Sequence, residues 1–96
     1  MTSKDRAKLR ALASVEPAIL QVGKGGINDH LIEQVANALK ARELVKLSVL
    51  ETAGCSPREA AELLAEATGA AVVNTIGSRF VLYKKKEKDS KIGIDV

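Results

Sequence analysis

The chain has 96 residues, 46% of them hydrophobic and 28% charged, and a formal net charge of +3. This size and composition indicate one folded domain with a modest core and exclude a disordered chain. No apolar run approaches the roughly 20 residues that span a bilayer, no apolar signal-peptide core follows the N-terminus, and the single Cys55 excludes an internal disulfide. We therefore expect a soluble cytoplasmic protein.

The N-terminal part of the chain predicts a short helix followed by a strand. The helix covers residues 4–13, and Ser3 or Thr2 can cap it. Its apolar stripe is expected to consist of Leu9, Leu12 and Ala13. Pro17 interrupts the chain, and residues 18–22 are a strand candidate.

A glycine-rich segment, Gly23-Lys24-Gly25-Gly26, lies where this strand ends and the next helix begins. Helix N-termini expose unpaired N–H groups that attract phosphate, and glycine lets a ligand approach the backbone. The segment lacks the G-x-x-x-x-G-K-[ST] pattern of nucleotide loops, and Asn28 breaks the dinucleotide pattern G-x-G-x-x-G. What remains is G-x-x-G, which in KH domains clamps a nucleic-acid backbone. A tight turn that needs glycine is the structural alternative.

A second helix is predicted over residues 28–42, because Asn28 is a good N-cap and Asp29 complements the helix dipole. Its apolar residues recur at helical spacing: Leu31, Ile32, Val35, Ala36 and Leu39. Residues 44–50 then predict a strand with one apolar face and one face that carries Lys46 and Ser48.

A third helix is predicted to begin at Ser56, with Pro57 in the first helical position and Glu59 completing a capping box. Gly69 is expected to end it. Its predicted buried face consists of Ala60, Leu63, Leu64 and Ala67.

The C-terminal part predicts a hairpin, in which Gly77-Ser78 joins a strand over residues 70–76 to a strand over residues 80–83. The element order α-β-α-β-α-β-β predicts a compact α/β domain with a mixed four-stranded sheet packed with helices. Strands joined through a helix should be parallel, and the hairpin antiparallel. We assign residues 1–86 to this domain and residues 87–96 to a polar tail.

Positive charge is concentrated at both ends of the sequence. Residues 1–10 contain four basic residues and one acidic residue, and residues 79–91 contain six basic and two acidic residues. Residues 11–78, in contrast, contain five basic and eight acidic residues. Such segregation is typical of a polyanion binder, although basic ends that only aid solubility are the alternative. Phe80 and Tyr83 are the only aromatic residues. A nucleic-acid binder of this kind should therefore contact phosphates, with an affinity that falls steeply with salt.

Few residues are suited to catalysis. His30 and Cys55 are the only histidine and cysteine, and nothing in the sequence brings them together. Metal-ligand spacings such as C-x-x-C are absent, and the acidic residues of the third helix indicate a solvated stripe. We expect no catalytic residue, no metal and no cofactor.

Four blocks of sequence occur in order over about residues 4–86, namely Val22–Ile27, Ala38–Leu47, Thr68–Ala70 and Ile76–Tyr83. Together they resemble the CRM domain family (chloroplast RNA splicing and ribosome maturation), whose stand-alone bacterial members are the YhbY-like proteins. Arg42 stands where family members often have histidine, and it keeps a hydrogen-bond donor there.

The resemblance implies a fold similar to the C-terminal domain of translation initiation factor three. It also implies a non-catalytic protein that binds RNA, specifically ribosomal RNA in precursors of the large subunit. The implied RNA-contacting loop consists of Gly23, Lys24, Gly25 and Gly26. Lys46 aligns with the lysine of the family's H-E-L-I-K-V block.

The positive surface around such a loop can be extended by other basic residues, and we include Lys4, Lys8, Arg79, Lys84 and Lys85 in it. We expect a monomer with RNA as its partner and no membrane association. Two other function classes remain open. A small phosphate-ligand-binding enzyme would need a deep pocket beside the loop. A protein-interaction adaptor would need an exposed apolar patch on the open face of the sheet.

Overall fold

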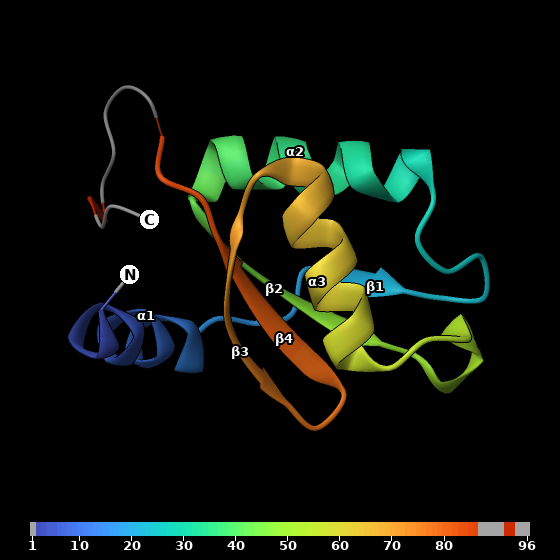
Figure 1. Cartoon of the computed structure of the whole chain (residues 1–96), viewed down its shortest axis with the longest axis horizontal. Helices are drawn as coiled ribbons and strands as arrows, with labels where there is room; N and C mark the ends of the chain where they lie inside the picture. The colour runs from blue at the N-terminus through green and yellow to red at the C-terminus, as the bar shows by residue number, and fades with distance from the viewer. Residues whose placement is uncertain (1, 87–91, 94–96) are drawn as a thin grey trace.

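The computed structural model describes residues 2–86 and 92–93, and Figure 1 shows how their helices and strands are arranged. The predicted order of elements is confirmed, with one short 3-10 helix added. In chain order the elements are α1 (Ser3–Ser14), β1 (Leu20–Val22), α2 (Asp29–Arg42), β2 (Leu44–Val49), η1 (Glu51–Ala53), α3 (Pro57–Thr68), β3 (Ala71–Ile76) and β4 (Arg79–Tyr83). The predicted tail over residues 87–96 lies outside the described residues, except for Ile92 and Gly93.

The four strands form one mixed sheet in the order β1-β2-β4-β3. β1 and β2 are parallel and are joined through α2, as predicted, and β3 and β4 form an antiparallel hairpin. β4 lies between β2 and β3 and pairs antiparallel with both. The two strands on either side of α3 therefore run in the same direction without being neighbours.

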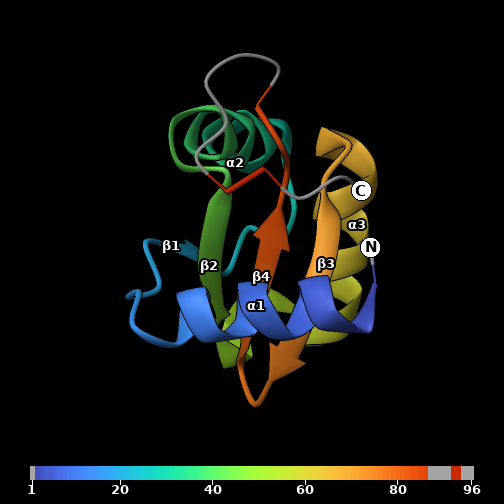
Figure 2. The ribbon, with the colours of Figure 1, turned by 90° about the vertical axis from the view of Figure 1, so that its left-hand side faces the viewer.

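The helices cover both faces of this sheet. α2 and α3 pack on one face, whereas α1 crosses the other, as Figure 2 shows with α1 in front of the strands. Residues alternate between the faces along each strand, so Leu47 and Phe80 join the core under α2 and α3. Val81 and Tyr83 instead join a smaller core with Leu9 of α1.

The buried side of α3 differs from the predicted one. Leu63 is 50% exposed and Ala67 is exposed, whereas the buried residues are Ala60, Ala61, Leu64 and Thr68. Thr68 can be buried because its hydroxyl donates a hydrogen bond of 2.7 Å to the carbonyl oxygen of Leu64. Because hydropathy treats threonine as polar, the hydropathy pattern predicts the wrong buried side for α3. Leu12 of α1 is also 39% exposed, contrary to its predicted burial.

Glu43 lies between α2 and β2 and hydrogen-bonds to the residue that follows β4. It is buried and has a φ of 65°, a conformation that non-glycine residues rarely adopt. Its N–H donates to the carbonyl oxygen of Leu39, and its own carbonyl accepts a hydrogen bond of 2.9 Å from the N–H of Lys84. The start of the basic segment after β4 is thereby fixed against α2.

Candidate nucleic-acid interface

The glycine-rich loop is a tight turn with a lysine at its tip. The N–H of Gly26 donates a hydrogen bond of 2.9 Å to the carbonyl oxygen of Gly23, and Lys24 is exposed. Within residues 2–86 and 92–93, the N–H groups of Lys24 and Gly25 donate no hydrogen bond. The turn therefore presents two backbone donors and an ammonium group to an incoming acceptor.

Gly23 and Gly26 differ in how strongly the fold requires glycine. Gly26 has a φ of +63°, and an added Cβ would lie 3.3 Å from the carbonyl oxygen of Ala53 in η1. The turn alone thus explains Gly26. At Gly23 a Cβ would meet only Leu50 Cδ1, at an ordinary 3.7 Å, and the backbone has no positive φ. Folding therefore does not require glycine at position 23.

The loop leads directly into the N-terminus of α2. Asn28 is the predicted N-cap, and its side chain accepts a hydrogen bond of 2.9 Å from the N–H of Leu31. The partial positive charge of the helix end adds to that of Lys24. Asp29, in the first turn of α2, opposes this positive charge because the Asp29 carboxylate is exposed beside the loop.

Two of the predicted RNA-contacting lysines also bind the C-terminal ends of helices. Lys46 Nζ lies 3.4 Å from the carbonyl oxygens of both Ala13 and Glu16, at the end of α1. Lys84 Nζ lies 2.7 Å from the carbonyl oxygen of Thr68, the last residue of α3. Both cations therefore offset the negative ends of helix dipoles, in addition to any contact with a ligand.

The predicted basic residues do not form one continuous site. The loop and α1, which carries Lys4 and Lys8, lie toward opposite ends of the longest axis of the molecule, which measures 35 Å (Figure 1). The fold does bring Lys46 together with Arg79. Both line a hollow of about 220 Å³ beside α1 and a neighbouring hollow of about 350 Å³. Neither hollow includes a residue of Gly23–Gly26, so neither is the deep pocket that the enzyme alternative needs beside the loop.

Some residues around these hollows were not anticipated from the sequence. Arg10 and Asn74 line the smaller hollow, and Gln21 lines the larger one. Arg10 belongs to the basic N-terminal cluster, so the charge pattern of the sequence could have identified it. Nothing in the sequence singles out Gln21 or Asn74 as surface-site residues.

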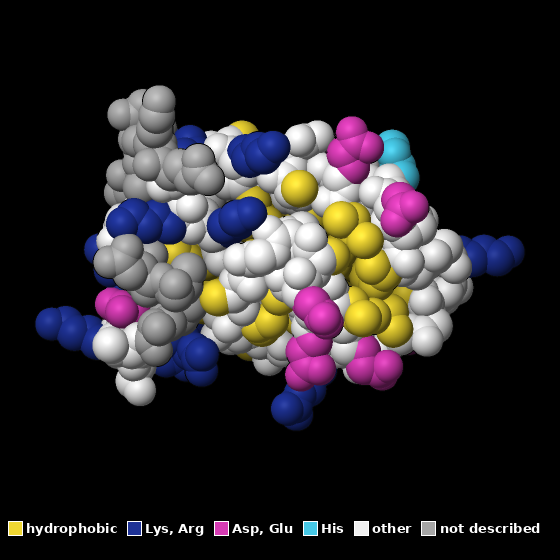
Figure 3. All heavy atoms as spheres, turned by 45° about the horizontal axis from the view of Figure 1, so that its top comes forward, with side chains coloured by type: hydrophobic (Ala, Val, Ile, Leu, Met, Phe, Trp, Pro, Cys, Tyr) yellow, Lys and Arg dark blue, Asp and Glu magenta, His cyan; other side chains and the backbone are white. Residues whose placement is uncertain are grey.

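The opposite side of the molecule, formed by α2 and α3, carries a row of acidic residues on α3. Figure 3 shows acidic side chains around an apolar area over the right part of this view, and Lys and Arg side chains over its left part. Glu59, Glu62 and Glu66 of α3 are all exposed. Their negative charge repels phosphate, which disfavours this part of the surface as an RNA contact.

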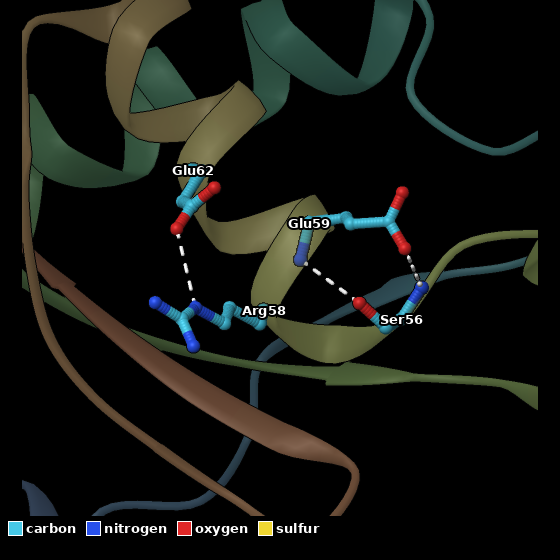
Figure 4. A network of polar contacts seen from close by, with 4 residues as sticks. All are labelled: Ser56, Arg58, Glu59 and Glu62. Carbon is cyan, nitrogen blue, oxygen red and sulfur yellow. Dashed lines mark hydrogen bonds and ion pairs between the residues drawn. The ribbon is translucent and has the colours of Figure 1, made fainter.

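Local contacts at the start of α3 help to fix these carboxylates, as Figure 4 shows. The predicted capping box is present, with the Glu59 N–H 3.1 Å from Ser56 Oγ and the Ser56 N–H 3.4 Å from Glu59 Oε1. Arg58 pairs with Glu62 at 3.3 Å, but both side chains are too exposed for the pair to contribute much stability.

Among the residues that the structure describes, no group of three His, Cys, Asp or Glu side chains could hold a metal ion. In the same part of the chain, no helix combines the length and the apolar character needed to cross a membrane.

The chain is similar to known proteins over nearly its whole length. The family model of the CRS1 / YhbY (CRM) domain matches residues 1–84. The probable RNA-binding protein YqeI of Bacillus subtilis is 42% identical over 92 residues, with 96% of each chain covered. An RNA-binding protein of Haemophilus influenzae is 33% identical over 92 residues, which cover 92% of this chain and 89% of the relative. The solution structure of the hypothetical protein SAV1595 from Staphylococcus aureus has a TM-score of 0.78 at 36% identity, and the match covers 99% of both chains.

Proposed function

This chain belongs to the CRS1 / YhbY (CRM) domain family, and from that membership we propose that it binds RNA without catalysing a reaction. The relatives from Bacillus subtilis and Haemophilus influenzae are both named as RNA-binding proteins. The observation that carries the proposal is the turn at Gly23–Gly26, with its exposed lysine and two unpaired N–H groups. Such donors suit the phosphate oxygens of an RNA backbone.

In this proposal the loop holds the RNA backbone and other basic residues extend the contact. Lys24 and the N–H groups of Lys24 and Gly25 bind phosphates, while Gly23 lets the strand approach. Lys4 and Lys8 lie one turn apart on α1 and can share a face. The remaining contacts are assigned to Lys46, Arg79, Lys84 and Lys85. Because this binding is mostly electrostatic, its affinity should fall steeply with salt.

The target that we propose is ribosomal RNA in a precursor of the large subunit, bound by a cytoplasmic monomer. The support for this target is the resemblance of the sequence blocks to the stand-alone bacterial members of the family. Crosslinking in cells followed by sequencing of the bound RNA tests it. Recovery mainly of large-subunit precursor RNA is expected, and recovery mainly of messenger or transfer RNA would overturn this target.

The role of the loop is tested with the double variant Lys24→Glu, Gly25→Asp. We expect a large loss of affinity for structured ribosomal RNA, with an unchanged circular dichroism spectrum. Lys40→Glu is the matched control, because it reverses an exposed lysine on α2, away from the loop. If the double variant lost no more affinity than this control, the loop would not be part of the interface.

A further inference from the structure

Part of the sheet face that α1 crosses is left uncovered, and Gln21, Ile76 and Arg79 are exposed there. The register places Gln21 beside Ser48, Ser48 beside Arg79, and Arg79 beside Ile76, so these four residues form one row across all four strands. The row lies on the α1 side, because its neighbours along the strands, such as Leu47 and Phe80, are in the core under α2 and α3. Ile76 is 70% exposed although it is a large apolar residue.

The hollow of about 220 Å³ lies between this row and the last turns of α1. Val81 and Ile76 give it apolar walls, and Asn74 contributes an amide. Arg10, Lys46 and Arg79 surround it with positive charge. Its volume is below the 300–1,000 Å³ usual for drug-sized ligands, which favours a single small group. Apolar walls suit the face of a base, an amide suits its polar edge, and cations suit a phosphate. Together these groups match one nucleotide.

The cations at this hollow can still accept a ligand. The guanidinium of Arg79 makes no hydrogen bond or ion pair with any described residue. Lys46 uses two long contacts of 3.4 Å to the end of α1, and its ammonium group has three donors. A phosphate beside the hollow would therefore find charge that the fold does not neutralise.

The row also connects the hollow with the glycine-rich loop. Gln21 is two residues before Gly23, and Ser48 lies in the next strand of the row. Strands in a sheet are about 4.8 Å apart, so Gln21 and Arg79 are about 10 Å apart across the sheet. The larger hollow, which Gln21, Ser48 and Arg79 line, fills this interval.

We propose that the hollow beside α1 binds one unpaired nucleotide of an RNA strand whose backbone continues to the loop at Gly23–Gly26. Its base lies against Ile76 and Val81, the Asn74 amide contacts the base edge, and Arg79 binds the phosphate. This site rests on the proposed RNA-binding function. It adds a preference for RNA with a single-stranded segment, which the loop alone does not give.

The test compares two RNAs by fluorescence anisotropy, a blunt hairpin and the same hairpin with a short single-stranded extension. We expect the extended hairpin to bind more tightly. Ile76→Ala should weaken binding of the extended hairpin about fivefold, no more than the low end of the range for a base on an aromatic side chain because isoleucine is aliphatic, and leave the blunt hairpin unaffected. Leu63→Ala on α3 is the matched control, because Leu63 is also an exposed large apolar residue.

Abasic substitution separates a base contact from a backbone contact. In a set of extended hairpins, each RNA lacks the base at a different position. One of these RNAs should lose as much affinity for the unaltered protein as the complete RNA loses for Ile76→Ala. Combining that RNA with Ile76→Ala should cause no further loss. If every abasic RNA bound normally, or if Ile76→Ala had no effect while Lys24→Glu weakened binding, the nucleotide site would be overturned and RNA binding would stand. If neither RNA bound to the unaltered protein, both proposals would fail.

Discussion

The ammonium group of Lys46, in the middle of β2, lies 3.4 Å from the carbonyl oxygen of Ala13, at the end of α1. Ala13 is buried against the sheet. The same lysine lines both hollows on this side of the molecule. One charge thus holds α1 to the sheet and contributes to the proposed RNA-binding surface.

Replacing Lys46 with methionine should therefore affect both stability and binding. Methionine keeps much of the apolar stem but cannot bind the α1 carbonyls, so we expect the free energy of unfolding in urea to fall by about 0.5–1 kcal/mol. The slope of log affinity against log salt should decrease by about one if Lys46 contacts a phosphate. An unchanged unfolding free energy would mean that the contact with Ala13 contributes nothing to the docking of α1.

Gly26→Ala should destabilise the protein by about 1–2 kcal/mol, because φ is +63° at this position and an L-residue is strained there. Gly77→Ala is a matched control, since its φ is +58° but nothing lies within 4 Å of an added Cβ. Urea unfolding of both variants separates the cost of the backbone conformation from that of the contact with Ala53. Equal losses would show that the loop can move away from η1 at no cost.

Gly23→Ala should separate RNA binding from folding. An added Cβ makes only an ordinary contact of 3.7 Å with Leu50, so we expect the free energy of unfolding to change by less than about 0.5 kcal/mol. The methyl group would hinder close approach of an RNA strand and lower its affinity several-fold. Anisotropy titrations measure this effect, and wild-type affinity in a stable variant would remove Gly23 from the proposed contact.

Asp29→Asn should strengthen RNA binding while weakening the helix. The carboxylate stabilises the N-terminus of α2 by about 0.3–1 kcal/mol, and it repels phosphate at the same helix end. We expect tighter binding at low salt, a smaller gain at high salt and a slightly lower melting temperature. Glu66→Gln on α3 is the control for a change in net charge alone. An equal gain in both variants would argue against phosphate binding at the start of α2.

Local signals predicted the elements of this fold well, because they depend on residues close together in the chain. Asn28 and Ser56 cap helices through side-chain bonds to amides three residues away. Gly69 ends α3 in a left-handed conformation, as predicted. The glycine-rich loop could likewise be identified from its composition, although its contact with RNA stays a prediction.

Features that depend on distant contacts could not be predicted in this way. The burial of Thr68 in place of Ala67 depends on how α3 rotates against the sheet. The φ of 65° at Glu43 depends on its packing and on the hydrogen bond from Lys84. Neither interaction leaves a trace in hydropathy or helix propensity.

The sequence by itself determined the helices, the strands, the loop and the excess of positive charge at both ends. Only the tertiary structure decided which of these charges act together. The insertion of β4 between β2 and β3 sets Arg79 beside Ser48 and brings Asn74 to the same hollow as Lys46. Strand order and register are set by burial on both faces of the sheet at once, so no single segment of the chain contains that information.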